Sequence, residues 1–301
     1  MFGLKRKKGY FSKAKRERLL LLLPVTVLIG ALSVYPVLRG IWLGFTSYKV
    51  GRDADFNGLG NYVGIYNSGF LGTTFKNIAF MMVVSVVIIY LLSMTLALLL
   101  NSKVPLRPLW RTLLIIPWAV PPVAKISMWK AIFDPLRGYA NAILLRLGWI
   151  DSSISWLSDT HYAIWTVICV LVWGCIPFLT LSLLSTLQQI PSDIQEAAAL
   201  DGASRWQMFR FITLPYLSQT TSICMSLIFV WIMNDFTSQF LMTGGGPGSA
   251  TLTPIVEAYR QGFKYGNFGY ASAYGNMMIL CVSVVVFFYI RAVNKKDAGV
   301  N

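Results

Sequence analysis

A short polar set interrupts an apolar segment in the C-terminal third of the chain. The stretch FVWIMNDFTSQF carries Trp231, Asn234 and Asp235, and the spacing of four between Trp231 and Asp235 predicts that they share one face of a helix. An aspartate inside an apolar segment is costly in lipid and is functional by default. Aromatic faces together with hydrogen-bonding side chains can hold a hydroxyl-bearing molecule, because an unpaired hydroxyl costs several kcal/mol away from water. This set therefore predicts a small-molecule binding site.

A second stretch, VWGCIPF, adds Trp173 and Phe178 as aromatic candidates. Structural alternatives stay open for these side chains. Asp235 would also suit a hydrogen bond between helices, and tryptophans often pack between helices or lie in an interfacial belt.

Residues for catalysis or metal binding are scattered. Asp134, Asp235 and Glu257 stand singly, and His161 is the only histidine. A membrane enzyme would need paired carboxylates, a nucleophile with its base, or metal ligands at workable spacing. The cysteines form no CxxC pair and are interpreted as small buried hydrophobic residues: Cys169, Cys175, Cys224 and Cys281. No catalytic residue and no metal site is expected.

The composition places the chain in a membrane. Of its 301 residues, 55% are hydrophobic and only 13% are charged, and the mean hydropathy is +0.60. The formal net charge of +14 would suit nucleic-acid binding if the basic residues gathered on one folded face. Instead they cluster between Lys5 and Arg18, before the first apolar run, and in short connections, as membrane topology requires. The expected partner is therefore the lipid bilayer and not nucleic acid.

Six apolar runs are long enough to cross about 30 Å of hydrocarbon as helices. The predicted fold is an all-α, polytopic membrane protein with spans at about Leu19 to Phe45, Ile78 to Leu100, Leu113 to Phe133, Tyr162 to Leu184, Thr220 to Leu241 and Ala271 to Ile290. A basic tail of residues 1–18 precedes this membrane domain of residues 19–291, and residues 292–301 form a second tail. Lys and Arg are concentrated in both tails and in alternate loops, so both termini are expected in the cytoplasm.

The third predicted span is rich in proline. Pro117, Pro121 and Pro122 each remove a backbone donor, so this helix is expected to be kinked or broken. Bent helices suit a protein that changes shape around a pathway, although a static kink fits the prolines equally well. Lys125 lies deep in the same span, and whether it lines a wet pathway stays open.

The connection of residues 191–215, between spans four and five, predicts two short helices. Pro191 stops the preceding helix, and Ser192 with Gln195 fits a capping box, as does Ser204 with Gln207.

Gly202 is expected where the first short helix ends, because glycine turns left-handed without penalty. The second helix should run toward the membrane until Pro215. Several apolar residues here exceed what a solvated loop needs. They would pack either on the membrane domain of the chain itself or on a cytoplasmic partner, and periodicity does not choose between the two.

The same connection resembles a known motif. Glu196-Ala197-Ala198, Gly202, Ile212 and Leu214-Pro215 match without a gap the EAA loop of binding-protein-dependent ABC transporter permeases. The flanking stretches WLSDTHYAIWTVICVLVWGCIPFL and FLMTGGGPGSATLTPIVEAYRQGFKYGNFGYASAYGNM resemble the carbohydrate-uptake subfamily of maltose and glycerol-phosphate type. The resemblance implies an inner-membrane subunit whose EAA loop docks on a cytoplasmic ATPase through Glu196, Ala197, Ala198, Asp201, Gly202, Ile212, Leu214 and Pro215.

The resemblance also implies partners. No GxxxxGK[ST] phosphate loop occurs in the chain, so no cofactor is expected in it, and ATP and Mg would be bound by partner subunits. The expected complex contains a second permease subunit, which is expected to be a paralogue, and two copies of an ABC ATPase. An extracytoplasmic solute-binding protein would deliver the substrate to the outer loops, where Gly244 to Gly248 lie. The expected location is the cytoplasmic (inner) membrane of a bacterium.

In maltose-type relatives, the positions that match part of the polar and aromatic set lie at the translocation site. The resemblance thus implies a carbohydrate pathway lined by Cys175, Phe178, Trp231, Ile232 and Asp235. Trp173 and Asn234 are predicted as further pathway residues from their residue types alone.

Two other classes of function remain as alternatives. A secondary transporter driven by an ion gradient would couple through intramembrane carboxylates, and only Asp235 meets that expectation. An integral membrane enzyme is less well supported, for the reasons given above. An ABC permease should purify with an ATPase subunit, whereas proteins of the other two classes should act alone.

Overall fold

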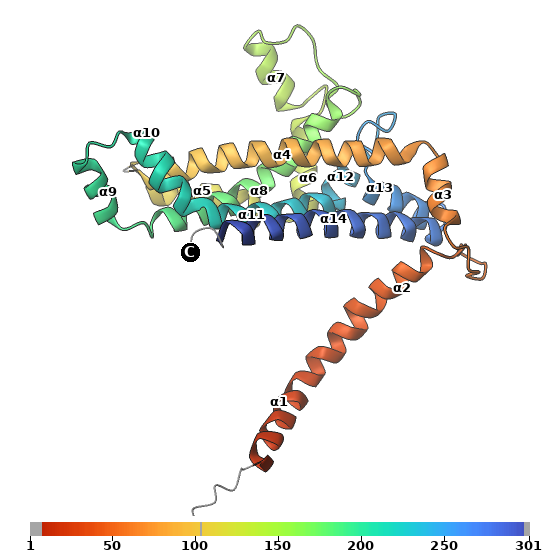
Figure 1. Ribbon diagram of the computed structural model, residues 1–301. Helices are drawn as coiled ribbons and strands as arrows, with labels where there is room; N and C mark the ends of the chain where they lie inside the picture. Colours follow the sequence, from red (N-terminus) through yellow and green to blue (C-terminus); the bar gives the residue numbers. More distant parts are fainter. Residues whose placement is uncertain (1–7, 103, 298–301) are drawn as a thin grey trace, which may run out of the picture.

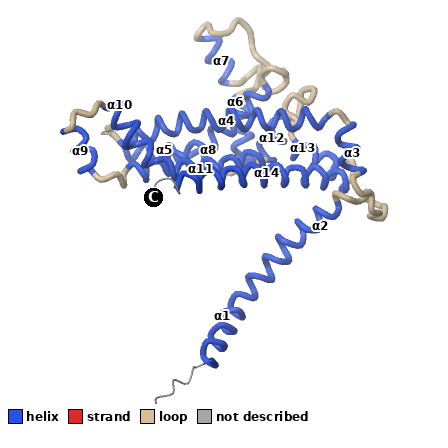
Figure 2. Tube along the Cα trace, in the orientation of Figure 1, coloured by secondary structure: helices blue, strands red, loops and turns tan. Residues whose placement is uncertain are grey.

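The computed structural model describes residues 8–102 and 104–297, and helices joined by loops make up this part of the chain (Figure 2). The helices are α1 (Lys8–Ile29), α2 (Tyr35–Leu43), α3 (Gly60–Asn67), α4 (Phe70–Asn101), α5 (Arg107–Ala119), α6 (Pro122–Ile132), α7 (Tyr139–Arg146), α8 (Ala163–Leu187), α9 (Ser192–Leu200), α10 (Arg205–Met208), α11 (Leu214–Asn234), α12 (Phe236–Thr243), α13 (Pro254–Tyr259) and α14 (Phe268–Asp297). Three π-helical turns continue helices at Gly30–Val34, Phe209–Thr213 and Arg260–Lys264. The all-α class is confirmed.

Five helices are long and apolar enough to cross a membrane, and α5 with α6 adds a sixth if that bent pair is one span. The five are Leu20–Leu43, Phe70–Asn101, Ala163–Leu187, Arg205–Asn234 and Phe268–Phe287. The count of six predicted spans therefore agrees with the structure when the broken third span is included.

The fifth predicted span is wrong at both of its ends. The helix starts at Arg205, inside the predicted loop, and it ends at Asn234, before the predicted end at Leu241. Hydropathy alone missed the start because Arg205, Gln207 and Arg210 interrupt the apolar residues of the first turns, and it missed the break because no proline marks it.

The core lies where α4, α8 and α11 pack together (Figure 1). Ile89, Leu183 and Ile228, one from each helix, are fully buried. Helix α8 is the central element, since 56% of the residues in its most apolar window are buried, and long apolar helices stabilise a bundle mainly through such packing.

The helix formed by α1 and α2 projects away from this bundle (Figure 1). None of the residues in its most apolar window is buried. Its end is fixed to the bundle by two asparagines: Asn61 Nδ2 donates to the carbonyls of Gly44 at 2.8 Å and Thr46 at 2.7 Å, and Asn276 Nδ2 donates to that of Ile41 at 3.0 Å. The exposed apolar surface of this helix is suited to lipid or to another membrane subunit.

Candidate functional site

Helices α9 and α10 form a loop at one end of the bundle, far from α3 (Figure 1). Helix α9 ends in a Schellman motif, in which Ala203 N–H donates to Ala198 O at 3.0 Å and Gly202 N–H donates to Ala199 O at 3.1 Å. Gly202 has φ +78°, a left-handed conformation that favours glycine. The predicted turn at Gly202 is therefore confirmed.

The two predicted capping boxes have different outcomes. Ser204 is the N-cap of α10, its hydroxyl accepts from Gln207 N–H at 3.3 Å, and Gln207 Oε1 accepts from Ser204 N–H at 2.7 Å, so this box is confirmed. The first box is wrong, because Pro191 is the N-cap of α9 and Ser192 is already inside the helix. Proline has a fixed φ that starts a helix without a side-chain cap, and Ser192 instead donates to Asp193.

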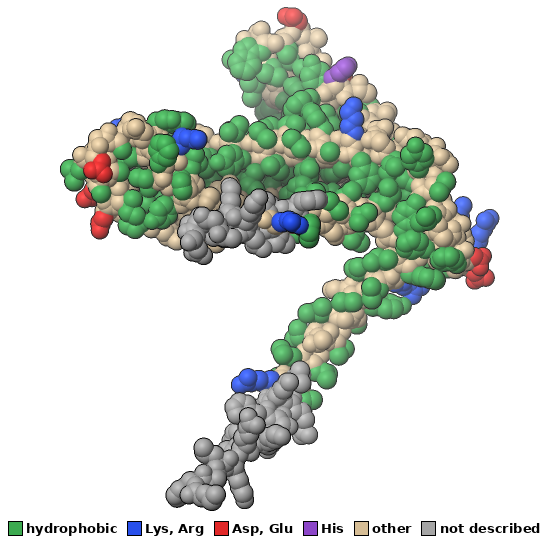
Figure 3. Space-filling model, viewed as in Figure 1, with side chains coloured by type: hydrophobic (Ala, Val, Ile, Leu, Met, Phe, Trp, Pro, Cys, Tyr) green, Lys and Arg blue, Asp and Glu red, His purple; other side chains and the backbone are tan. Residues whose placement is uncertain are grey.

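The apolar residues of the loop fall into two groups, one packed on the bundle and one exposed. Phe209 and Ile212 pack against the core of the bundle. Leu200, Trp206 and Phe211 remain 88%, 66% and 70% exposed, and no residue of α9 is buried. Acidic side chains gather at the same end of the molecule (Figure 3). A hollow of about 300 Å³ lies between the turn after α9 and the start of the long helix, lined by Asp201, Gly202, Ala203, Gln207, Met208, Phe211 and Ile212.

The second loop helix does not end at Pro215, contrary to the prediction. Pro215 lies inside a longer helix, and the π-helical turn at Phe209–Thr213 directly before it takes up the irregularity that its missing N–H causes. In that turn Leu214 N–H donates to Phe209 O, five residues back. The result is one helix of 30 residues, Arg205–Asn234, which is about 45 Å long at 1.5 Å per residue. It joins the exposed loop directly to the polar set around Asp235.

Two broken helices meet at the other end of this long helix. Helices α5 and α6 are bent by 101° at Val120 and Pro121, so the predicted break in the third span is confirmed. Helix α11 ends at Asn234, and Asp235 is the N-cap of α12, with Oδ1 accepting from Ser238 N–H at 2.8 Å. The two segments after the breaks, α6 and α12, pack against each other. Discontinuous helices of this kind provide backbone polar groups for substrate in membrane transport proteins.

The break at Asp235 limits the predicted helix of Trp231 and Asp235, which ends at the aspartate. Asp235 has φ −75°, which is helical, and ψ 79°, which is not, so it is at once the last residue that follows α11 and the N-cap of α12, and the chain turns after it. The aspartate starts a new helix because its carboxylate satisfies an N–H group that would otherwise be unpaired. Periodicity cannot show such a break, since no proline marks it.

An aromatic wall lies beside the two breaks, formed by Trp118 of α5, Phe178 of α8 and Trp231 of α11. The ring centroids of Trp118 and Phe178 are 5.9 Å apart, and those of Phe178 and Trp231 are 4.8 Å apart. Trp118 is 57% exposed and Trp231 is 39% exposed, so both rings offer surface to a ligand. The structure thus brings together Phe178 and Trp231 from the predicted set.

The other predicted pathway residues lie elsewhere or are shielded. Trp173 packs edge-on against Trp129 with centroids 5.6 Å apart, and both line a separate apolar hollow of about 390 Å³. Ile232 is 1% exposed and belongs to the core. Asn234 is exposed and donates to Val230 O of its own helix at 2.8 Å. Cys175 is partly buried and close enough to Asp235 and Lys125 for both charges to act on its thiol.

Sequence reasoning missed two residues of this region. Trp118 carries no signal of its own in the sequence, because a tryptophan beside a proline in an apolar run is ordinary helix packing. Gln239 is fully buried beside the break, where its Nε2 donates to Ile232 O at 3.0 Å and its Oε1 accepts from Thr253 Oγ1 at 2.5 Å. An amide inside the apolar stretch that follows Asp235 is the signal that would have found it.

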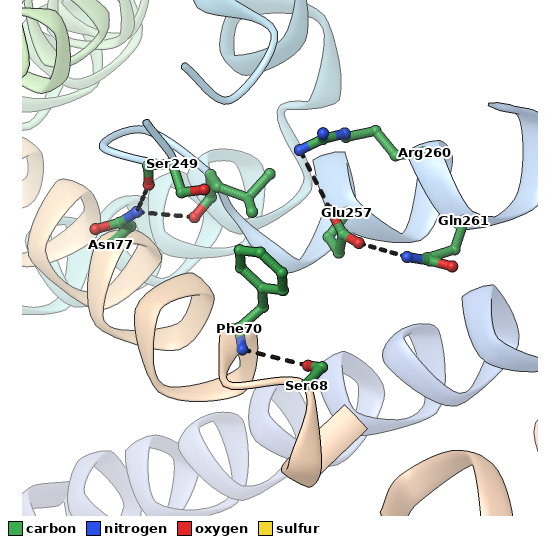
Figure 4. Close-up of polar contacts among 8 residues, drawn as sticks. Ser68, Phe70, Asn77, Ser249, Glu257, Arg260 and Gln261 are labelled. Carbon is green, nitrogen blue, oxygen red and sulfur yellow. Dashed lines mark hydrogen bonds and ion pairs between the residues drawn. The ribbon is translucent and has the colours of Figure 1, made fainter. Parts of the chain in front are cut away.

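The glycine-rich loop after α12 is held by Asn77 of α4 (Figure 4). Asn77 Nδ2 of α4 donates to Ser249 O at 3.0 Å and to Leu252 O at 2.9 Å. Glu257 of α13 is 5% exposed and lies 3.6 Å from Arg260, and it accepts from Gln261 Nε2 at 2.7 Å. Among the described residues, no three His, Cys, Asp or Glu side chains gather as a metal site.

The five apolar helices and the broken sixth span of the described residues define a polytopic membrane protein. The chain belongs to the family of binding-protein-dependent transport system inner membrane components, whose family model matches residues 89–296. It is therefore a permease component.

Three named relatives are similar in sequence to this chain over nearly its full length. The chain is 31% identical to the trehalose/maltose transport system permease protein MalF of Thermococcus litoralis, over 90% of this chain and 92% of that protein. It is also 31% identical to the lactose transport system permease protein LacF of Rhizobium radiobacter, over 91% and 92%. The sulfoquinovosyl glycerol permease protein SmoG of Agrobacterium fabrum is likewise 31% identical, over 92% and 90%.

The fold also matches a solved structure. A bacterial ABC transporter involved in the import of the acidic polysaccharide alginate matches with a TM-score of 0.82 and 22% identity, covering 95% of this chain and 98% of that one. The likeness establishes the permease fold.

Proposed function

We propose that this chain forms one membrane half of an ATP-driven importer and lines half of a pathway for a carbohydrate. Relatives of known name carry trehalose and maltose, or lactose. The aromatic wall beside the broken helices fits this substrate class, because sugar C–H faces stack on aromatic rings while polar groups satisfy hydroxyls.

The observation that carries the proposal is the continuous helix Arg205–Asn234. One end lies in the exposed loop of α9 and α10, and the other ends beside Trp231 and Asp235. A rigid element transmits a displacement, whereas a flexible loop absorbs it, so a push on the loop would reach the pathway. The loop residues Glu196, Ala197, Ala198, Asp201 and Gly202 would contact an ATPase, with Ile212, Leu214 and Pro215 continuing into the lever.

The partners follow from this role. A second permease, expected to be a paralogue, would complete the pathway and cover apolar surface of the bundle. Two ATPase subunits would supply the energy, with ATP and Mg bound outside this chain. A solute-binding protein would deliver the sugar, since a related alginate transporter was solved with a substrate-bound periplasmic protein. Both termini would be cytoplasmic, and the chain itself would be a transport subunit without catalytic activity.

Reconstitution tests the proposal. The chain is purified with its co-encoded subunits and inserted into liposomes that contain ATP, and uptake of labelled sugars is measured with and without the binding protein. The expected result is uptake that requires ATP, the ATPase and the binding protein. Uptake by the isolated chain, driven by an ion gradient, would support a secondary transporter and refute the proposal.

A further inference from the structure

Lys125 carries a positive charge into the apolar part of the bundle. It lies in the first turn of α6, directly after the 101° bend, and its side chain is partly buried. Its ammonium group approaches α8 closely, since a Cβ built on Gly174 would be only 3.1 Å from Lys125 Nζ. Gly174 therefore leaves the room that the ammonium group occupies.

Within the part of the chain that the structure describes, no carboxylate lies within ion-pair distance of Lys125. The ion pair found there, between Glu257 and Arg260, lies in another element. The carboxylate that shares its surroundings, Asp235, caps the start of α12 through the N–H of Ser238 and lies beyond ion-pair distance of Lys125. An ammonium group away from bulk water is costly unless a counter-charge or water compensates it. The ammonium group of Lys125 is therefore available to bind an anion from outside this chain.

The ammonium group also borders the aromatic wall. Gly174 and Phe178 are four apart on α8 and share a helix face, so Lys125 lies against the same face as the middle ring of the wall. A sugar ring stacked on Phe178 or Trp231 would bring its substituents toward Nζ. A charge beside stacking rings distinguishes ligands by their ionic groups, whereas rings alone distinguish them only by shape.

We propose that Lys125 binds an anionic group of the transported carbohydrate, so that the substrate is an acidic sugar bearing a carboxylate, sulfonate or phosphate group. This inference rests on the proposed function and adds the substrate class to it. Lys130, in the last turn of the same helix, is exposed and provides a matched control.

The test measures equilibrium binding to the purified complex of both permeases and the ATPases, without the binding protein. The probes are matched pairs: digalacturonate with galactobiose of the same linkage, sulfoquinovose with glucose, and glucose 6-phosphate with glucose. We expect at least one anionic member to bind about tenfold or more tightly than its neutral partner, because a hydrogen bond to a charged group adds that much affinity. High salt should reduce the difference.

Three variants complete the test. Lys125→Gln should abolish the preference for the anionic sugar without weakening binding of the neutral one, Lys125→Arg should retain the preference, and Lys130→Gln should behave as the wild type. Absence of an anionic preference in all pairs, or a preference that survives Lys125→Gln, would overturn the inference. Loss of the second permease from the Lys125→Gln complex would also overturn it, because Lys125 would then pair across the subunit interface.

The inference and the proposed function fail in different ways. A complex that imports a neutral sugar with ATP and shows no anionic preference would refute the role of Lys125 and keep the proposed function. A chain that neither assembles with an ATPase nor moves any sugar would refute both.

Discussion

Phe178 of α8 and Trp231 of α11 bring their ring centroids within 4.8 Å of each other, although they belong to two separate membrane helices. This contact joins the central helix of the bundle to the end of the long helix that begins in the exposed loop. Movement of the long helix would therefore change the wall that we propose to contact the sugar.

Removal of one ring should weaken sugar binding. We expect Trp231→Ala to lower the uptake rate at low substrate concentration about threefold to tenfold, because an aromatic contact contributes about 0.5–1.5 kcal/mol. Trp173→Ala is the control, since Trp173 packs against Trp129 away from the wall. Its sugar affinity should stay normal. Equal losses of uptake in both variants would contradict the assignment of the wall.

Asp235 has a structural and an electrostatic role that two variants separate. Asp235→Ala removes the cap of α12 and should lower stability by about 1 kcal/mol, measured by thermal unfolding, and should also lower uptake while the ATPase stays attached. Asp235→Asn keeps a capping oxygen and should restore stability. If Asp235→Asn also transports at the normal rate, the negative charge is not required for transport.

The loop should tolerate little change at its turn. Gly202 has φ +78°, so Gly202→Asp strains the Schellman motif and adds a charge beside the hollow that the turn and α10 line. We expect the variant to remain in the membrane but to lose ATPase co-purification and ATP-driven uptake. Glu196→Lys should give the same loss by reversing an exposed charge. Normal uptake by assembled complexes of both variants would refute the coupling role.

Gln239 should be important for folding. Gln239→Leu leaves Ile232 O and Thr253 Oγ1 without their buried partner, and each unpaired group costs about 1–3 kcal/mol. The expected result is a clearly lower unfolding temperature of the purified chain in detergent. Thr253→Val removes only one of the two contacts and should cost less. A Gln239→Leu variant as stable as the wild type would show that the amide is not a structural bridge between α11 and α13.

The topology is open to direct test. In a chain whose native cysteines are replaced, Ser204→Cys in the loop should react with an impermeant thiol reagent only from the cytoplasmic side. Ser249→Cys, in the loop held by Asn77, should react only from the outside. Ser249 lies outside the long helices, and Ser204 is the N-cap of the helix that starts at Arg205, so Ser204→Cys removes only a cap at the exposed end of that helix. Labelling of both positions from one side would refute the proposed orientation.

Local sequence patterns explain why the membrane helices and several helix ends could be predicted. Hydropathy located the membrane helices, and Ser204, Gln207 and Gly202 marked helix ends because caps and left-handed turns act within a few residues. The same local logic failed at Ser192, where Pro191 starts the helix, and at Pro215, where a π-helical turn lets the helix continue. In both cases a neighbouring feature decides the outcome: Pro191 takes the N-cap position predicted for Ser192, and the π-helical turn lets the helix continue past Pro215.

The amino-acid sequence by itself determined the membrane class, the helix content and the EAA motif, since these depend on composition and short-range spacing. Only the tertiary structure decided that α11 breaks at Asp235, that Trp118 joins Phe178 and Trp231, and that Trp173 and Ile232 face elsewhere. The physical reason is that the direction of a side chain across a bundle follows from the packing of whole helices, and no local interaction specifies that packing.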